Sequence, residues 1–449
     1  MRTRLSSTQQ IILSFLVVIL SGSFLLNTNM AQLESSTSTY FDHLFTAVSM
    51  VCVTGLFTHP VVETYTIVGQ IVCILLMQIG GLGLMTLIAI ILIGSGRRLA
   101  RREQLVLTQA INRETLSDFK PYLWSIVKYT FVIEALGMFF LSLRFVPQFG
   151  LGRGLFNALF VAVSGFTNAG FDNFSTYSLL DYASDPIVSL TVPALIILGG
   201  IGFSIWFDLK NTYKDLEKFS LKVYFRRLQT HTKLVFVVTS FFITVGTILA
   251  LLLEHDTGLA HLNWGGKVLA AFFQSVTMRT AGFATVDFIK MHSGLNLVYV
   301  FLMFVGGSPG GTAGGVKTTT IALVFLFVLN HLKGRKKVTI FKHTINPDNV
   351  RNALNVFFIY LLVYFVALLA LTIVEPTKNF LSLAFETISA LSTVGVTINL
   401  TPSLSKIAQT ILMFLMFMGR VGPITLLLSF TKSRKERELT YTESHILIG

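Results

Sequence analysis

The segment Ser392-Thr393-Val394-Gly395-Val396 has three degenerate copies earlier in the chain. Each copy keeps the glycine in its fourth position, and ten residues before each glycine stands a phenylalanine. The four glycines are spaced 115, 112 and 113 residues apart. Such regular spacing over a 449-residue chain indicates four tandem repeats. The other copies are Cys52-Val53-Thr54-Gly55-Leu56, Thr167-Asn168-Ala169-Gly170-Phe171 and Arg279-Thr280-Ala281-Gly282-Phe283.

A second glycine-rich landmark follows each copy at a nearly constant distance. Its first glycine lies 25, 29, 24 and 24 residues after the glycine of the preceding copy. The apolar stretch before each copy has about a dozen residues, which is too short to cross a hydrocarbon core about 30 Å thick. We therefore expect each repeat to contain a membrane span, a re-entrant pore helix, a polar loop and a second span. The landmarks are Ile79–Gly83, Leu198–Gly202, Val305–Gly307 and Met418–Gly422.

The predicted fold is an all-α integral membrane protein with eight membrane spans, in which four parallel span–pore loop–span repeats surround one pore. The repeats are assigned to residues 1–95, 96–210, 211–335 and 336–449, the last including a C-terminal tail. The first span is also compatible with a signal peptide, because Arg2 and Arg4 precede its apolar run, but the repeat pattern requires it as a span. Opening spans are predicted at Ile11–Leu26, Tyr122–Val146, Thr232–Leu253 and Asn355–Val374, and closing spans at Thr66–Ile93, Ile187–Phe207, Leu295–Leu329 and Ile407–Phe430.

Composition and charge agree with a membrane protein. Hydrophobic residues make up 53% of the chain, charged residues only 13%, and the mean hydropathy is +0.70. A soluble domain cannot bury that much apolar surface, whereas in a bilayer this surface faces lipid. The net charge of +13 arises mainly from Lys and Arg between the repeats and at the two ends. The positive-inside rule places these segments and both termini in the cytoplasm of a multi-pass cell-membrane protein, so no nucleic-acid partner is expected.

The four glycine segments suit a cation selectivity filter. A dehydrated cation in a low-dielectric medium costs tens of kcal/mol, and rings of backbone carbonyls offset this cost. Glycine admits the backbone conformations that turn carbonyls towards an axis, and Thr393-Val394-Gly395 is the start of the familiar potassium filter string. The alternative is that the glycines only allow close helix packing. The predicted filter comprises Val53, Thr54, Gly55, Asn168, Ala169, Gly170, Thr280, Ala281, Gly282, Thr393, Val394 and Gly395, with potassium at the backbone carbonyls of Gly55, Gly170, Gly282 and Gly395.

Acidic residues are expected to assist at the outer mouth of this filter. They lie in the loops opposite the basic segments, and Asp42 and Asp287 are two of them. A cleft lined by negative charge raises the local concentration of cations. The C-terminal ends of the four pore helices would add partial negative charge near the ion.

The closing span of the third repeat is interrupted by Gly306-Gly307-Ser308-Pro309-Gly310-Gly311-Thr312-Ala313-Gly314-Gly315. Glycine costs a helix about 1 kcal/mol and proline about 3, so this segment is predicted to form a loop inside the membrane, just below the filter. We interpret it as a gate, and a static kink is the alternative. A phosphate-binding loop is a further alternative, although Val316 separates the last glycine from Lys317. The predicted gate residues are Gly306, Gly307, Gly310, Gly311, Thr312, Ala313, Gly314, Gly315 and Arg420.

Arg420 completes this predicted gate from the last span. An arginine inside a membrane is costly and by default functional, and it carries five donors and no acceptor. Carbonyls of the glycine-rich loop are the expected partners, so that Arg420 would latch the loop in place. The alternative is a salt bridge with an acid such as Glu386. Arg279 borders a filter segment and is expected to brace it, whereas Lys317 is compatible with simply ending the loop.

These four pore loops, the Thr-Val-Gly string, the glycine-rich interruption and the lone Arg420 resemble the Trk/Ktr/HKT potassium transporters, most of all the KtrB-type membrane subunits. The resemblance covers essentially the whole chain. It implies potassium uptake, a homodimer with one pore per subunit, and a cytosolic nucleotide-binding RCK ring as regulator. Sodium dependence is common in the Ktr branch. Some plant relatives carry serine in the first filter segment and favour sodium, so Gly55 at this position favours potassium.

An enzyme and a sodium transporter are the competing classes of function. An intramembrane enzyme would need a Ser–His pair, an HExxH motif or paired aspartates, and the sequence shows none at suitable spacing, so no enzyme is expected. Potassium, with sodium as a second possibility, is the expected transported ion, and no organic cofactor is expected in this chain. Membrane lipids are expected partners. A sodium-permeable or sodium-coupled transporter of the same architecture stays open as the alternative.

Overall fold

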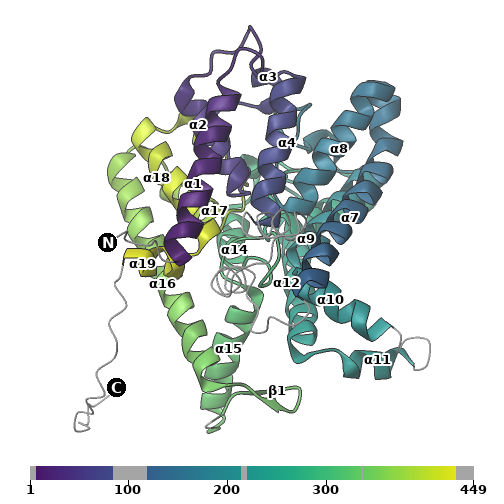
Figure 1. Cartoon of the computed structure of the whole chain (residues 1–449), viewed down its shortest axis with the longest axis vertical. Coiled ribbons are helices and arrows are strands. Elements are labelled where there is room, and N and C mark those ends of the chain that lie inside the picture. The colour runs from purple at the N-terminus through teal and green to yellow at the C-terminus, as the bar shows by residue number, and fades with distance from the viewer. Residues whose placement is uncertain (1–6, 84–118, 214–219, 336, 431–449) are drawn as a thin grey trace.

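The structure is a computed structural model of the chain and describes residues 7–83, 119–213, 220–335 and 337–430. Four long apolar helices open the four repeats, as predicted (Figure 1). In the described ranges four helices are long and apolar enough to cross a membrane, or five if one bent pair counts as a single span. The long helices are α1 (Ser7–Leu26), α7 (Phe119–Phe149), α12 (Thr230–Glu254) and α16 (Pro347–Val374).

A shorter helix follows each long one and ends directly before a filter segment. Side-chain caps begin two of these pore helices, because Asn263 accepts from the amide of Gly266 and Asn379 accepts from the amide of Leu381. Each packs against the long helix of its own repeat. The pore helices are α2 (Tyr40–Val51), α8 (Leu151–Thr167), α13 (Trp264–Thr277) and α17 (Phe380–Leu391).

The closing spans differ from the sequence-based expectation in their continuity. The sequence predicted an interruption in the third repeat alone, but the second and fourth are broken as well. Gly202 (φ 101°) and Gly422 (φ 95°) adopt left-handed backbone there, and the helices on either side of the second-repeat break meet at 88°. The helices are α4 (Ile67–Leu82), α9 (Pro186–Gly200) with α10 (Phe203–Thr212), α14 (Ser293–Phe304) with α15 (Thr318–Leu332), and α18 (Lys406–Val421) with α19 (Pro423–Phe430).

The predicted span count and domain limits depend in part on residues that the structure does not describe. The end of the first closing span, beyond Gly83, lies outside the described residues, as does the basic segment around Arg101. The count of eight spans therefore stays a prediction, although the all-helical membrane fold is established. The repeat boundaries stay predictions as well.

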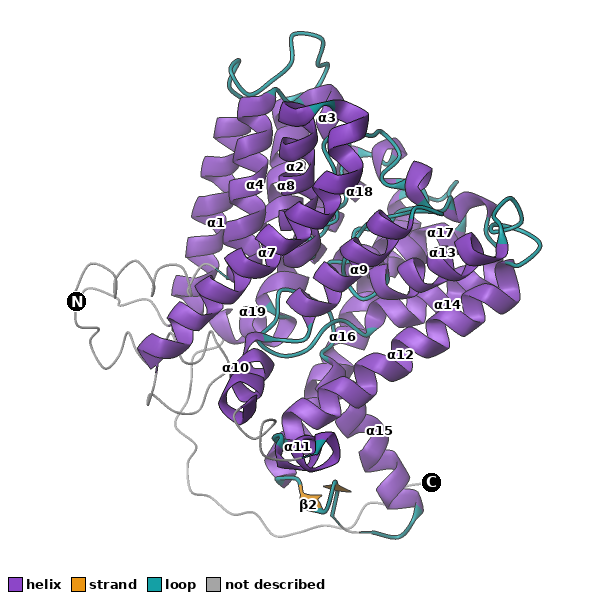
Figure 2. Cartoon of the chain, turned by 90° about the vertical axis from the view of Figure 1, so that its right-hand side faces the viewer, coloured by secondary structure: helices purple, strands orange, loops and turns teal. Residues whose placement is uncertain are grey.

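The remaining elements lie at the two ends of the molecule. Helices α10, α11 (Leu221–Arg227) and α15 project from the end opposite α3 (Val61–Thr64) in both views (Figures 1 and 2). The basic residues Lys210, Arg226 and Arg227 occupy the last turns of α10 and α11, so the described part of the basic connections lies on one side. At the same end, β1 (Thr339–Ile340) pairs antiparallel with β2 (His343–Thr344). Elsewhere, a single 3-10 turn precedes each of three closing spans: η1 (Leu180–Tyr182), η3 (Phe288–Lys290) and η4 (Thr401–Ser403).

The landmark glycines fasten the closing spans to the pore helices. A β-carbon added to Gly80, Gly199 or Gly419 would overlap a carbonyl oxygen in the last turn of the adjacent pore helix. Only glycine allows the two backbones to approach this closely. The constant distance between copy and landmark thus reflects a contact that recurs in three repeats. The overlapped carbonyls belong to Val51, Phe166 and Leu391.

The outer faces of the long helices carry exposed apolar side chains. Phe24, Phe139, Phe241 and Phe365 are each more than half exposed. A water-soluble protein does not present such a continuous apolar surface, so these faces meet lipid. Helix α1 packs against α2 and α4, which makes it part of the helical body, as the repeat pattern required.

The buried carboxylate of Glu254 joins the end of α12 to the outer loops, and its removal is expected to destabilise the fold. Glu254 is fully buried and accepts from the amides of Gly258 (2.9 Å) and His292 (2.8 Å) and from the Thr257 hydroxyl. Replacement by alanine strands these donors, so Glu254→Ala should lower the free energy of unfolding by about 2–4 kcal/mol. Thermal unfolding in detergent measures the loss. Asp256→Ala is the control, because that side chain is 93% exposed, and equal effects of the two substitutions would contradict the assignment.

Candidate cation site

The four filter segments meet at one place. A β-carbon built on Gly170 would lie 2.6 Å from the Cα of Gly282, and one built on Gly395 would lie 2.7 Å from the Cα of Gly55. A β-carbon on Gly55 would in turn lie 3.4 Å from the Cα of Gly170. Each glycine therefore faces its neighbours, and segments separated by more than one hundred residues surround a common axis.

All four segments share one backbone pattern despite their different sequences. The glycines have positive φ, at 108°, 74°, 87° and 89° in chain order. The residue two positions earlier also has positive φ: Val53 (57°), Asn168 (62°), Thr280 (70°) and Thr393 (52°). Left-handed backbone is unfavourable for β-branched residues and costs about 1–3 kcal/mol at each such position. The surrounding contacts must therefore hold the filter in this conformation.

Serine side chains from the pore helices supply part of this support. The Ser49 hydroxyl accepts from the amide of Gly55 (3.1 Å), and Ser389 accepts from that of Gly395 (3.0 Å). Ser164 accepts from the amide of Phe171 at 2.8 Å. The third repeat has valine at the equivalent position, and there the Thr277 hydroxyl donates to the carbonyl of Phe283 (2.7 Å) instead. The carbonyl ends of all four pore helices point at this region and contribute partial negative charge.

A small cavity of about 130 Å³ lies at the outer end of the filter. Three of the four filter glycines line it, together with Thr397 and Asp287. The Asp287 carboxylate is 32% exposed and lies 3.6 Å from the ammonium of Lys290. Asp287 is thus one of the predicted outer acids in a position to attract cations to the mouth. The lining glycines are Gly170, Gly282 and Gly395.

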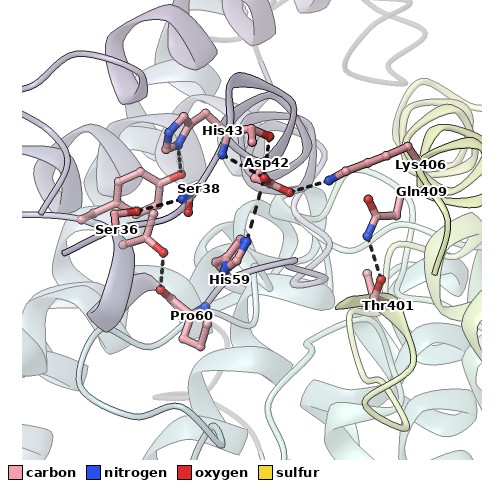
Figure 3. Close-up of polar contacts among 12 residues, drawn as sticks. Ser36, Ser38, Asp42, His43, His59, Pro60, Thr401, Lys406 and Gln409 are labelled. Carbon is pink, nitrogen blue, oxygen red and sulfur yellow. Dashed lines mark hydrogen bonds and ion pairs between the residues drawn. The ribbon is translucent and has the colours of Figure 1, made fainter. Parts of the chain in front are cut away.

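Asp42 does not fit the same expectation. Its carboxylate is buried and accepts from the backbone amide of Thr39 (3.0 Å) and the ammonium of Lys406 (3.0 Å), with the His59 ring 3.9 Å away (Figure 3). Burial alone would raise the pKa of Asp42, but the Thr39 hydrogen bonds and the Lys406 charge hold it below its usual value. Asp42 therefore ties the first pore helix to α18, and the expectation that it attracts ions at the mouth is wrong.

Glu386 supports the loop that directly follows the fourth filter segment. It is fully buried on α17 and accepts from the Ile398 amide (3.2 Å), the Thr401 hydroxyl (2.8 Å) and the Thr397 hydroxyl. These donors occupy both of its oxygens. The alternative in which Glu386 forms a salt bridge with Arg420 is therefore wrong. Sequence reasoning missed this support, because an isolated glutamate in an apolar helix does not reveal which segment it will face.

The glycine-rich loop between α14 and α15 is closed at its base and docked on the second repeat. At the base, the Gly306 amide donates to the carbonyl of Val316 (2.9 Å) and the Thr318 amide to that of Gly307 (3.0 Å). Further along the loop, the amides of Ser308 and Thr312 donate to carbonyls at the end of α9. The structure thus contains the predicted intramembrane loop, and these amides are paired with carbonyls, as a low-dielectric setting requires. The α9 acceptors are Gly200 (2.9 Å) and Gly199 (3.2 Å).

The loop touches two filter segments directly. The Thr312 hydroxyl donates to the carbonyl of Phe166 (3.1 Å) and to the side-chain oxygen of Asn168 (3.3 Å). A β-carbon on Gly314 would lie 3.0 Å from the carbonyl of Ser392 and would overlap the hydroxyl of Thr393. Because Phe166 lies in the last turn of a pore helix and Asn168, Ser392 and Thr393 begin filter segments, the loop lies against the end of the filter nearest the pore helices, opposite the mouth cavity.

Three cationic side chains bind carbonyls around this loop. One Nη group of Arg420 donates to the carbonyl of Thr312, and the other donates to Gly80 and to Gly81 (3.1 Å). Lys317 donates to the carbonyl of Ala313 at 2.6 Å. Arg279, which is buried, approaches the carbonyl of Gly306 at 3.5 Å. The expected contact between Arg420 and the loop is present, whereas Lys317 holds the loop instead of merely ending it.

The phosphate-binding alternative lacks its structural context. A P-loop follows a strand and offers backbone amides to the phosphate. This loop follows helix α14, its amides at Gly306, Ser308 and Thr312 are already bonded to carbonyls, and the Lys317 ammonium is bonded within the loop.

Comparisons with known proteins agree with the geometry. Residues 3–439 match the TrkH family, described as cation transport proteins. The chain is 37% identical over 442 residues to the Ktr system potassium uptake protein B of Vibrio alginolyticus, covering 98% of this chain and 94% of the relative. It is 35% identical over 451 residues to the protein of that name from Bacillus subtilis, with coverage of 99% and 97%. It is also 36% identical over 455 residues to the potassium/sodium uptake protein NtpJ of Enterococcus hirae, with coverage of 100% and 98%.

A solved structure shares the fold. The potassium transporter TrkH of Vibrio parahaemolyticus superposes with a TM-score of 0.73 at 20% sequence identity. The match covers 96% of this chain and 86% of the other. At this identity the likeness establishes the architecture of helices and loops.

The buried carboxylate beside the filter leads to a local prediction. Glu386→Ala removes the acceptor of the Ile398 amide, and a hydrogen bond to a charged group contributes about 1.5–3 kcal/mol, so this amide should exchange its hydrogen about tenfold faster or more. Hydrogen–deuterium exchange of the purified protein measures the rate. Glu63→Ala on α3 is the control, because its side chain is exposed. Unchanged exchange at residues 397–401 in Glu386→Ala would show that Glu386 does not support the segment.

Proposed function

The chain belongs to the TrkH family of cation transport proteins, and on this basis we propose that it takes up potassium through one pore with a four-segment carbonyl filter. The observation that carries the proposal is the shared backbone of the four segments, with left-handed residues at Gly55, Gly170, Gly282 and Gly395 around one axis. The potassium uptake named for the relatives from Vibrio alginolyticus and Bacillus subtilis supports it.

The filter would act by replacing the hydration shell of the ion. Four equivalent carbonyl positions form a ring, and successive residues along each segment stack further rings above it. The strained residues Val53, Thr280 and Thr393 are held in place by pore-helix contacts, so the ligands are organised before the ion arrives. Asp287 at the mouth cavity and the carbonyl ends of the pore helices favour a cation at either end.

The intramembrane loop would act as the gate. It lies against the end of the filter that faces away from the mouth cavity, where an ion leaving the filter must pass. Arg420 connects the loop to the first repeat and Lys317 stabilises its fold, so positive charge also stands beside the ion path. Conduction would require the loop to leave its sites on Gly199, Gly200 and Phe166. A loop with two discrete docking states fits the behaviour of known switching elements.

A sodium-permeable or sodium-coupled transporter is the second candidate. The Enterococcus hirae relative carries potassium/sodium uptake in its name and is as similar to this chain as the potassium relatives are. The family resemblance favours potassium at this point, because some plant members with serine in the first filter segment favour sodium, and this chain has Gly55 there. Ion flux alone separates the two candidates.

The cellular setting and partners form part of the same proposal. The protein would be a multi-pass component of the cell membrane with both termini in the cytoplasm, since the described basic connections gather at one end. It would act as a homodimer with one pore in each subunit, regulated by a cytosolic nucleotide-binding RCK ring. The ends of α10, α11 and α15, which project on the side of the basic connections, offer a surface for such a ring (Figure 2).

The filter proposal is tested by cation flux into proteoliposomes. Potassium and rubidium should enter the wild-type protein faster than sodium. A β-carbon at position 395 would overlap the carbonyl oxygen of Thr54, so Gly395→Ser should reduce the potassium-to-sodium ratio by about tenfold or more. Gly152→Ser is the matched control, because a β-carbon there meets nothing within 4 Å. Equal entry of sodium and potassium through the wild type would favour the second candidate instead.

The gate proposal is tested in the same vesicles. Arg420→Ala removes charge-assisted hydrogen bonds to Thr312, Gly80 and Gly81, each of which contributes about 1.5–3 kcal/mol. The potassium flux should rise by about tenfold, and Arg420→Lys should give an intermediate flux because lysine cannot bridge both sets of carbonyls. Arg351→Ala, at an exposed position on α16, is the control. If Arg420→Ala folds normally and conducts at the wild-type rate, the latch does not exist.

A further inference from the structure

A groove of about 530 Å³ runs along the outer surface between α7 and α9. Its lining is apolar except for Thr191. Gly137 lies at the contact between the two helices, where a β-carbon would come within 2.7 Å of the Leu195 side chain. Phe140 and Leu190 are lining residues and are about half exposed, so the groove opens towards the bilayer.

The groove has the length of one membrane leaflet. On α7 its lining extends from Ile133 to Leu143, and on α9 from Pro186 to Leu198. At about 1.5 Å per residue these stretches measure about 15–18 Å. A hydrocarbon core is about 30 Å thick, so the groove reaches from one surface to the middle of the bilayer. It starts on the side of the filter mouth, where α9 begins after the loop of the second repeat.

A cationic side chain stands at the surface end of the groove. Arg144 directly follows the lining residue Leu143, and its side chain is 39% exposed. Its Nε donates to Asp185 at 2.5 Å, and the guanidinium lies 5.6 Å from the ring centre of Tyr182. Asp185 also caps α9 by accepting from the amides of Ile187 and Val188. Within the described part of the chain, Nη1 and Nη2 of Arg144 have no hydrogen-bond acceptor, so both are available to a ligand.

We propose that this groove binds one phospholipid from the leaflet on the mouth side, with an acyl chain between α7 and α9 and the phosphate on Arg144. A guanidinium already oriented by Asp185 and Tyr182 binds a phosphate with two parallel hydrogen bonds, at low cost in side-chain entropy. The phosphate contact distinguishes a bound lipid from the other lipids around the protein, because acyl chains alone gain nothing by exchanging one apolar surface for another. The inference goes beyond the proposed transport function and depends only on the membrane location of α7 and α9.

Native mass spectrometry of the purified full chain tests the proposal. Phosphatidylglycerol and a diacylglycerol with the same acyl chains are titrated separately in mild detergent. We expect one phosphatidylglycerol to bind per chain about tenfold more tightly than the diacylglycerol. Arg144→Gln should remove this difference, and Arg144→Lys should restore part of it. Lys290→Gln is the charge control, because Lys290 is an exposed cation on the same side whose side chain is 78% exposed.

A second pair of variants tests the groove itself. Ala194→Trp places an indole in the groove and should abolish the tight site for both lipids, whereas Ala135→Trp, at an exposed α7 position outside the lining, should leave it unchanged. The thermal unfolding temperature of every variant confirms folding, and Ala194→Trp remains informative if Arg144→Gln unfolds. Equal binding of the two lipids by the wild type, or tight binding that survives Ala194→Trp, would overturn the proposal. Loss of a dimer in Ala194→Trp without any change in lipid binding would overturn it too, by assigning the groove to a second copy of the chain.

Discussion

One backbone constraint underlies the whole architecture: four short segments must hold left-handed residues side by side around a single axis. Residues such as Val53 and Thr393 avoid this conformation in isolation, so the rest of each repeat supplies the missing stabilisation. The pore helix ends at the segment and directs its carbonyl end and a hydroxyl group towards it, and the landmark glycine brings the closing span against the helix end. The long apolar helix then covers this assembly from the lipid side.

Glycines perform two distinct tasks in this arrangement. In the filter, Gly55 and Gly395 provide positive φ and leave no side chain between neighbouring segments. In the landmarks, Gly80, Gly199 and Gly419 provide close backbone packing between helices. Close helix packing, which is the alternative role for the filter glycines, is observed at the landmark glycines. The regular spacing in the sequence shows that both sets of glycines recur, but only the surroundings of each glycine in the structure distinguish the two roles.

The intramembrane loop is stabilised by cationic side chains that bind carbonyl oxygens instead of carboxylates. Arg420, Lys317 and Arg279 all approach carbonyl oxygens, and the carboxylate of Glu386 is occupied by donors that follow the fourth filter segment. Carbonyl dipoles satisfy the donors of these side chains without cancelling their charge, so the region below the filter stays positive. Under the proposed transport function, a cation leaving the filter would meet both a backbone obstruction and an electrostatic barrier, and a single movement of the loop would reduce both. This arrangement accounts for the presence of costly cations at membrane depth.

The sequence alone determined the repeat architecture, the four opening spans, the pore helices, the four glycine segments that follow them and the existence of the intramembrane loop. These features follow from local patterns of apolar length, glycine spacing and helix-breaking residues, which recur in every repeat. Only the tertiary structure decided which partners the polar groups choose. Arg420 bonds to carbonyls 108 and 340 residues away instead of to Glu386, and Asp42 bonds to a lysine 364 residues away instead of facing the mouth. The breaks at Gly202 and Gly422 were missed for a related reason, because a single glycine continues or ends a helix according to the neighbours it meets.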